Sequence, residues 1–108
     1  MKKSILLAIV IALGATATAR AGGQDVWTQS CAKCHGTDGT GQTNMGKRLG
    51  CRDYTDAKVQ ASVSDADAIT AVKSGFKNSD GKTVMKAYDS LSDDDVKAVV
   101  AYLRTLKK

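Results

Sequence analysis

The sequence has 108 residues, with 16 Lys and Arg against 11 Asp and Glu, three Cys, one His, one Trp and no Pro. A chain of this length predicts one small domain, and its positive charge lies partly at the N-terminus, because Lys2, Lys3 and Arg20 precede residue 22. The remaining 13 basic residues stand against 11 acidic ones, a net charge of about +2, so the overall charge does not support a nucleic-acid-binding protein, which needs a basic stripe with aromatic residues. Three Cys is an odd number, which does not suit a disulfide framework.

Residues 1–21 have the pattern of an export signal. Lys2 and Lys3 form a basic start, residues 5–13 are an uninterrupted apolar run, and Ala19-Arg20-Ala21 is a cleavage site of the A-x-A type. The run is shorter than the roughly 20 apolar residues of a membrane-spanning helix, and an uncleaved anchor is the alternative. We therefore expect cleavage after Ala21, a mature domain over 22–108, and a periplasmic protein without an integral membrane segment.

The pattern over residues 23–34 predicts a short helix. Val26, Trp27, Ser30 and Cys31 recur on one face at helical spacing. We expect Trp27 to be a core aromatic residue whose indole N–H finds a hydrogen-bond partner.

The end of this helix carries Cys31-Ala32-Lys33-Cys34-His35, a C-x-x-C-H motif typical of covalent c-type haem attachment. Two thiols that add to the two vinyl groups of one porphyrin must lie a fixed short distance apart. The following His is then placed to bind the iron from the proximal side. The motif alone is only moderately specific, so its surroundings matter.

Residues 36–50 are rich in Gly, Thr and Asn, and this composition predicts a long loop. A loop of this length in a small domain is usually functional or wrapped around another group. Arg48 and Arg52 are candidates to bind a haem propionate, and the alternative is that both are solvated surface cations. We expect Cys51 to be a small buried residue, with an exposed thiol that forms an intermolecular disulfide as the alternative.

Two further helical segments are predicted before the C-terminal helix. Residues 53–62 favour a short helical turn, and a longer helix begins after Ser64 as N-cap and ends at Gly75. Its apolar stripe is formed by Ala68, Ile69 and Val72. Residues 77–82 form a turn, and no pair of strands joined by a turn is predicted.

The last helix has the clearest pattern. Ser92 is its N-cap, and three Asp residues occupy the first turn near the positive end of the helix dipole. Its apolar positions recur at i, i+3, i+4, i+7 and i+10, and its basic residues lie at the negative end: Val96, Val99, Val100, Leu103 and Leu106, then Arg104, Lys107 and Lys108. The domain is therefore expected to be all-α.

Together these residues resemble class I cytochrome c, and most closely the short bacterial forms described as c5-, c6- or c-553-like. The resemblance covers nearly all of residues 22–108. It rests on C-x-x-C-H near the start of the mature chain, the middle helix from Ser64 to Gly75, and Met85 followed by Ala87-Tyr88 and a last helix ending VVAYLRTL. It implies three to four short helices wrapped around one covalently bound haem c.

The resemblance also implies roles for single residues. Cys31 and Cys34 match the thioether cysteines, His35 the proximal iron ligand and Met85 the distal iron ligand. In the helix crossing of the family, Gly23 and Trp27 match first-helix positions, and Val99 and Tyr102 match the last-helix positions that pack against them. Two departures are Lys86 where relatives usually have Pro after the ligand Met, and the absence of a Pro whose carbonyl orients the proximal His.

The choice of sixth ligand also follows from counting donors. The single His excludes ligation by two His of one molecule. Met45 lies only ten residues past His35 and needs a tight path to the opposite ring face, whereas Met85 lies fifty residues past it, where the family places its ligand. We therefore expect Met85 to be the ligand and Met45 to be a core residue or a contact to the haem edge, with a buried-core role as the alternative for Met85.

The resemblance implies a soluble mono-haem carrier of single electrons between periplasmic or membrane-bound partners. With His/Met ligation and low-spin iron, no position stays open for peroxide or oxygen, so the protein is not expected to be an enzyme. Its donor and acceptor proteins would bind transiently to a monomer, and nucleic acid is not a partner. Four lysines either surround the haem edge and steer acidic partners or only keep the protein soluble: Lys33, Lys47, Lys82 and Lys86.

Four other interpretations remain open. A haem peroxidase or gas-binding protein requires a weak or missing sixth ligand. A zinc module would use Cys31, Cys34, His35 and Cys51. A thioredoxin-like C-x-x-C requires a βαβ context, which is not predicted. Finally, the domain would be a permanent subunit of a larger oxidoreductase.

Overall fold

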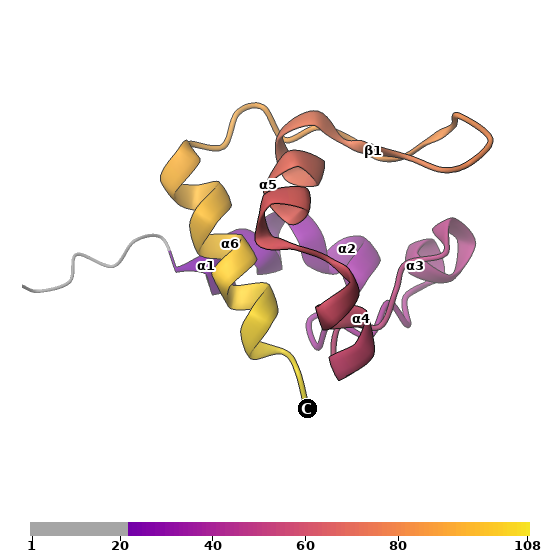
Figure 1. Ribbon diagram of the computed structural model, residues 1–108, viewed down its shortest axis with the longest axis horizontal. Helices are drawn as coiled ribbons and strands as arrows, with labels where there is room; N and C mark the ends of the chain where they lie inside the picture. The colour runs from indigo at the N-terminus through magenta and orange to yellow at the C-terminus, as the bar shows by residue number, and fades with distance from the viewer. Residues whose placement is uncertain (1–21) are drawn as a thin grey trace, which may run out of the picture.

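The computed structural model describes residues 22–108, so the predicted export signal lies outside the described part. The chain begins with a continuous helical segment composed of α1 (Gly23–Val26), the π-helical η1 (Trp27–Cys31) and α2 (Ala32–His35). The order then runs α3 (Asn44–Leu49), α4 (Ala57–Ser62), α5 (Asp65–Ser74), β1 (Phe76–Lys77), β2 (Thr83–Met85) and α6 (Asp93–Thr105). In Figure 1, α6 passes in front of α1, and the β1–β2 hairpin extends from the top of α5 toward the side where α3 lies.

The crossing of α1 and α6 is made possible by Gly23. A Cβ at this position would overlap the Ala98 carbonyl oxygen and lie 2.9 Å from Tyr102 Cβ. The ring of Trp27 packs against Tyr102 beside the crossing, with 5.9 Å between centroids. The close approach expected at Gly23 is therefore present, with Ala98 and Tyr102 as the nearest residues.

The buried core lies where the N-terminal helical segment, α5 and α6 meet. Val96 is completely buried and Val99 is 2% exposed. The other buried apolar residues are Val26, Trp27, Cys31, Ala68, Val72, Val100 and Leu103. The apolar faces predicted for the first and last helices therefore form the core.

Helix ends confirm the predicted caps. The hydroxyl of Ser64 accepts from the backbone N–H of Asp67 at 3.0 Å, and that of Ser92 accepts from Asp95 N–H at 3.1 Å. Gly75 ends α5 with φ of 79°. These local signals set the start of α5 and α6 because they satisfy backbone donors that a helix leaves free.

The loop predicted over residues 36–50 is wrong in its second half, where α3 forms. Thr43 is its N-cap, accepting from Gly46 N–H at 2.8 Å, and Gly50 ends it in the left-handed conformation with φ of 72°. Gly46 is buried, and a Cβ there would overlap the carbonyl oxygens of Cys34 and Gly41. Gly therefore allows α3 to pack closely against the cysteine-bearing helix. The helical turn expected over 53–62 is shorter than predicted and is α4.

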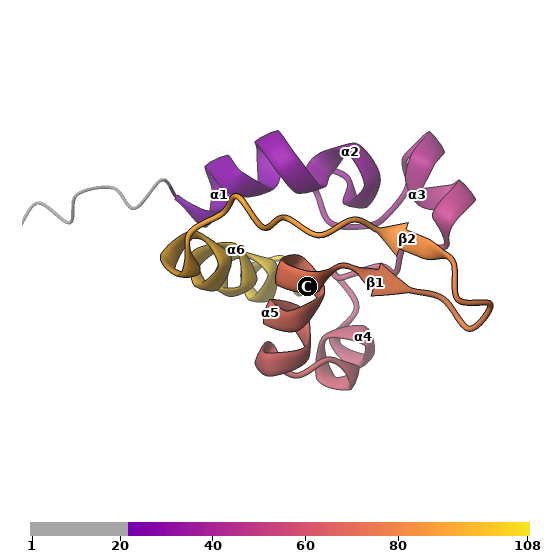
Figure 2. The ribbon, with the colours of Figure 1, turned by 90° about the horizontal axis from the view of Figure 1, so that it is seen from above.

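The expectation that no strand pair is present is also wrong. β1 and β2 form an antiparallel hairpin in which Phe76 pairs with Met85 and Lys77 with Thr83, with an irregular register between the two pairs. Asn78 closes the turn, because its side-chain oxygen accepts from the N–H groups of Asp80 and Lys82, each at 3.0 Å. The hairpin contains only five strand residues, so the mainly helical class is still confirmed. Figure 2 shows β1 and β2 side by side at the end of the molecule away from α6.

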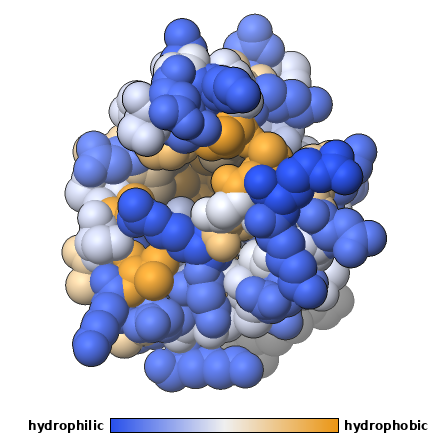
Figure 3. Space-filling model, turned by 90° about the vertical axis from the view of Figure 1, so that its right-hand side faces the viewer, coloured by the Kyte–Doolittle hydropathy of each residue, from blue (hydrophilic) through white to orange (hydrophobic). Residues whose placement is uncertain are grey.

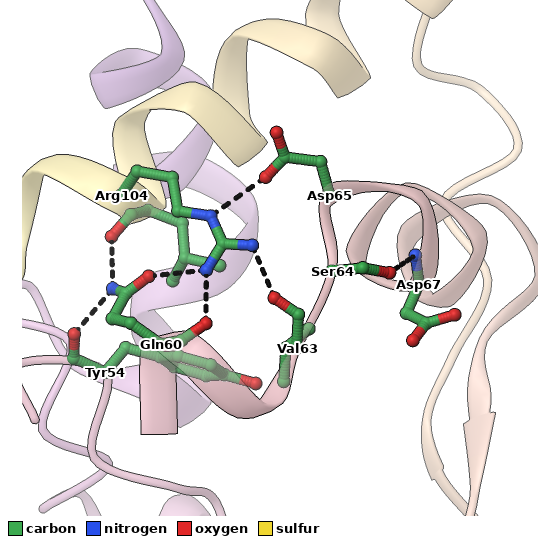
Figure 4. Close-up of polar contacts among 8 residues, drawn as sticks. Tyr54, Gln60, Val63, Ser64, Asp65, Asp67 and Arg104 are labelled. Carbon is green, nitrogen blue, oxygen red and sulfur yellow. Dashed lines mark hydrogen bonds and ion pairs between the residues drawn. The ribbon is translucent and has the colours of Figure 1, made fainter. Parts of the chain in front are cut away.

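A polar cluster joins α4, α5 and α6 (Figure 4). The Arg104 guanidinium donates to the Gln60 backbone and side-chain oxygens, to the Val63 carbonyl and to Asp65. The Gln60 amide in turn donates to the carbonyl oxygens of Tyr54 at 2.7 Å and Leu103 at 2.8 Å. Gln60 is 5% exposed, so these bonds satisfy a polar side chain that burial would otherwise make costly. Arg104, expected only to balance the helix dipole, instead links three elements.

Candidate functional site

The described part of the chain surrounds a cavity of about 1130 Å³. This volume exceeds the roughly 300–1,000 Å³ of typical small-molecule pockets. Figure 3 shows the hollowed face, with hydrophobic side chains along the hollow and hydrophilic ones around it. The sulfur-containing, imidazole and aromatic side chains of its lining are Trp27, Cys31, Cys34, His35, Met45, Cys51, Tyr54, Phe76, Met85 and Tyr88.

The two motif cysteines line this cavity as free thiols. Burial, and then the neighbouring Cys34, raise the pKa of the Cys31 thiol to about 11, so this group is protonated at neutral pH. The backbone of Cys34 is held by the loop before α3, because the Thr43 hydroxyl donates to the Cys34 carbonyl oxygen at 2.7 Å. The structure therefore presents both sulfurs to one cavity from one turn of helix.

His35 lies between two aromatic rings at the cavity wall. Its ring centroid is 5.5 Å from that of Trp27 and 5.7 Å from that of Tyr54. Burial lowers the pKa of His35, which favours the neutral imidazole that binds metals. Its Nδ1 is buried and has no hydrogen-bond partner within residues 22–108.

The unpartnered Nδ1 of His35 agrees with the absence of the Pro whose carbonyl orients the proximal His in many relatives. A metal-bound imidazole commonly donates its second N–H to an acceptor. The nearby Gly36 carbonyl accepts instead from Trp27 Nε1 at 2.8 Å, which confirms the expected partner for the indole. The His35 ring is therefore oriented by its packing between Trp27 and Tyr54, and not by a hydrogen-bond acceptor at Nδ1.

Both candidate methionines reach the same cavity. Met85 lies in β2 and Met45 in α3, and both are half-buried. Gly75 allows the backbone at Met85 to approach α5, because a Cβ there would lie 2.7 Å from the Met85 carbonyl oxygen. Both thioethers line the cavity, so the lining does not choose between them. Met85 therefore stays the predicted ligand on the grounds given by the sequence.

The charged residues predicted near the cofactor divide into two groups. Both arginines are exposed, but only Arg52 lines the cavity, where its guanidinium lies 3.3 Å from the Ser62 hydroxyl. All four lysines are exposed, and of these Lys33 and Lys86 line the cavity whereas Lys47 and Lys82 do not.

Cys51 differs from its prediction. It is only partly buried and lines the cavity, so the expectation of a core residue is wrong. It follows Gly50, which ends α3, and its N–H donates to the Gly46 carbonyl at 2.9 Å, so the end of this helix places it at the wall.

Two tyrosines were missed as site residues. Tyr54 packs against His35, and no local pattern connects two residues nineteen positions apart. The Tyr88 hydroxyl donates to the Ser30 carbonyl at 2.8 Å, and burial, followed by Cys31 and Cys34, raises its pKa. The position of Tyr88 three residues after Met85 was the only available signal for it.

A protein-family model described as cytochrome c matches residues 21–107. The chain belongs to the cytochrome c family. Its members carry covalently bound haem c with iron, transfer electrons with redox partners and typically function outside the cytoplasm. This protein is therefore an electron-carrying haem protein.

Solved structures agree with this family. The chain is 34% identical to a structure named KustC0563 c-type cytochrome, with a TM-score of 0.69, covering 81% of this chain and 99% of that one. A Kuenenia stuttgartiensis complex, described as reducing HAO-like protein Kustc0457/Kustc0458, shares the fold at 21% identity and a TM-score of 0.61, covering 79% of this chain and 41% of that one.

A curated relative is cytochrome c oxidase subunit 2 of Alkalihalophilus pseudofirmus, 34% identical over 87 residues. The match covers 72% of this chain but only 22% of that relative, so the chain spans about a fifth of its length.

The described residues fit a covalent haem better than the alternatives. An apolar-lined cavity contains three thiols, two of them from the C-x-x-C-H motif, together with an imidazole that has an unpartnered ring nitrogen and two thioethers. Within residues 22–108, no three or more His, Cys, Asp or Glu side chains gather to hold a metal ion, as the zinc module requires. The described sheet is one antiparallel hairpin and not the βαβ unit of a thioredoxin-like site. No helix over this range is long and apolar enough to cross a bilayer.

Proposed function

We propose that this protein is a mono-haem periplasmic carrier of single electrons with His/Met ligation. The observation that carries the proposal is the convergence of Cys31, Cys34, His35 and Met85 on one cavity. Bound haem c supplies the iron that gains and loses one electron. Export of the chain would follow from the predicted signal in residues 1–21.

The residues divide the work of holding the group. Cys31 and Cys34 would each add a thiol across one vinyl group, the sulfur bonding to carbon and the thiol proton passing to the other vinyl carbon. His35 would bind the iron through Nε2 from the side of Trp27 and Tyr54. Met85 would bind from the hairpin, and its soft neutral sulfur favours ferrous iron and so raises the reduction potential.

Filling both axial positions from within the chain leaves no place for a substrate. For this reason we propose an electron carrier rather than a peroxidase or gas-binding protein. Lys33, Arg52 and Lys86 line the cavity together with one acidic residue, Asp67, so its lining carries a net positive charge. Such a charge steers acidic redox partners and makes their association rate fall with salt.

The first test is the visible spectrum of the protein matured with haem. We expect a reduced-minus-oxidised spectrum of low-spin haem c and, in the oxidised form, a weak band near the red end of the visible range that reports methionine ligation. Met85→Ala should remove this band, whereas the matched Met45→Ala should keep it. Loss of the band only in Met45→Ala would reassign the ligand. High-spin iron and rapid carbon monoxide binding in the unmodified protein would contradict the carrier proposal.

A second test addresses the state of assembly. The likeness to one part of an oxidase subunit raises the alternative of a domain permanently held in a larger oxidoreductase. We propose a free monomer with transient partners. Size-exclusion chromatography of the native periplasmic extract should show the haem absorbance at the mass of the small domain, and elution with a large complex would contradict this.

A further inference from the structure

Tyr88 connects three elements around the cavity. Its backbone N–H donates to the Val72 carbonyl of α5 at 2.8 Å. Its hydroxyl donates at 2.8 Å to the carbonyl of Ser30, the residue directly before Cys31. Tyr88 itself lies three residues after Met85, so one residue fastens the segment behind Met85 both to α5 and to the cysteine-bearing helix.

This fastening matters because the two sides of Met85 are held differently. On the N-terminal side, Met85 pairs with Phe76 in a hairpin of irregular register, and Phe76 is 53% exposed. On the C-terminal side, residues 86–92 have no helix or strand before α6 begins. Here the long-range polar links are the two hydrogen bonds of Tyr88.

The residue directly after Met85 also rests on Tyr88. The Lys86 ammonium lies 5.3 Å from the centroid of the Tyr88 ring, within the range of a cation–π contact. The Tyr88 ring contacts Lys86 and the Tyr88 hydroxyl bonds the Ser30 carbonyl. If residues 85–88 move outward from the cavity, the hydrogen bond to Ser30 must therefore break.

We propose that Tyr88 is a positioning residue for Met85, and that its bond to Ser30 limits how often the methionine leaves the iron. The inference rests on the proposed function, because it takes Met85 as the distal ligand. The bond spans from the distal segment to the proximal helix. It therefore holds the two walls of the cavity at a fixed separation at the side where Met85 enters.

Tyr88→Phe tests this inference, since it keeps the ring and removes only the hydroxyl. Imidazole added to the oxidised haem-loaded protein binds only after the methionine has left, so its binding rate reports that departure. Loss of one hydrogen bond should raise this rate about five-fold. The matched control is Tyr102→Phe, because within residues 22–108 Tyr102 takes part in side-chain hydrogen bonding only through its backbone carbonyl, which accepts from Thr105, while its ring packs against Trp27. Its rate should stay within about two-fold of the unmodified protein.

The outcomes separate this inference from the proposed function. If the unmodified protein lacks the red-end band that depends on Met85, the proposed function fails and this inference fails with it. If the band is present but Tyr88→Phe and Tyr102→Phe exchange imidazole at the same rate, only the role of Tyr88 is overturned. A lower unfolding temperature in Tyr88→Phe without faster imidazole binding would also overturn it, since that result describes a purely structural residue.

Discussion

The crossing of α1 and α6 and the wall formed by α3 and the hairpin are stabilised in different ways. At the crossing, buried side chains of both helices, such as Val26 of α1 and Val99 of α6, belong to one core cluster, and Gly23 allows the two backbones to approach closely. In the wall, the hairpin places Phe76 53% exposed, and Met45 and Met85 are only half-buried against an open cavity.

The difference shows which part of the molecule needs a cofactor. Nine apolar residues make up the described core, and all of them lie in the N-terminal helical segment, α5 and α6. The wall has no comparable cluster in the described part of the chain, because its apolar side chains face the cavity. Filling that cavity with a large apolar ring would give the wall the packing partner that it lacks.

The largest expected effect comes from removing the attachment. We expect Cys31→Ser combined with Cys34→Ser to retain less than about a tenth of the haem and to lose about half or more of the free energy of unfolding. The protection that remains in hydrogen exchange should be concentrated in α1 and α6. Haem absorbance and denaturant unfolding measure the two effects, and Cys51→Ser is the control that should keep both haem and stability. Equal loss of protection in the crossing and the wall would break the comparison.

The next largest effect is expected from crowding the crossing itself. Gly23→Leu inserts a side chain where even a Cβ overlaps the Ala98 carbonyl oxygen. Because this contact is with backbone, rotation of a side chain cannot relieve it, and we expect a loss of about 3 kcal/mol or more. Denaturant unfolding of the haem-loaded protein measures the loss. Gln24→Leu, at the exposed neighbouring position, should cost less than about 0.5 kcal/mol. Similar losses in the two variants would show that the crossing is not tightly packed.

The sequence predicts the crossing well and the wall poorly, for physical reasons. The helices of the crossing have local signals, such as the Ser92 cap and the apolar period of the last helix, and these signals need no distant partner. The motif cysteines and His35 were likewise predictable as cavity residues because their chemistry depends on spacing within five residues.

The wall depends on contacts that no local pattern records. Strands of two and three residues are too short to show alternation, so the hairpin was missed even though Asn78 carries a turn signal. The Gly-rich composition concealed α3, although Thr43 and Gly50 mark its ends. The bonds of Arg104 to Gln60 join residues 44 positions apart, and single-sequence reasoning does not supply such pairs.

A smaller effect is expected where the two regions meet at Gln60. Gln60→Leu removes the amide that bonds the Tyr54 and Leu103 carbonyls and leaves Arg104 without one acceptor. We expect a loss of about 1–3 kcal/mol in denaturant unfolding. The exposed Gln42 provides the control, and Gln42→Leu should be nearly neutral. A neutral Gln60→Leu would mean that the polar cluster does not couple α4 to α6.

The smallest expected effect is at the surface between α5 and α6, where Lys73 lies 2.5 Å from Asp93. The hydrogen bond and charge of Lys73 hold the pKa of Asp93 below its usual value. A carboxyl whose pKa is lower in the folded state stabilises the fold at pH above its unfolded pKa, and this contribution is lost as the pH falls through the folded pKa. Lys73→Gln should therefore unfold at a slightly lower temperature than the unmodified protein at pH 7, and the difference should vanish in acid. Because both side chains are largely exposed, salt should reduce the difference at pH 7 as well. A difference that persists in acid would instead assign Lys73 a packing role in the helix pair, and the well-packed region would then extend further toward the surface than its buried residues show.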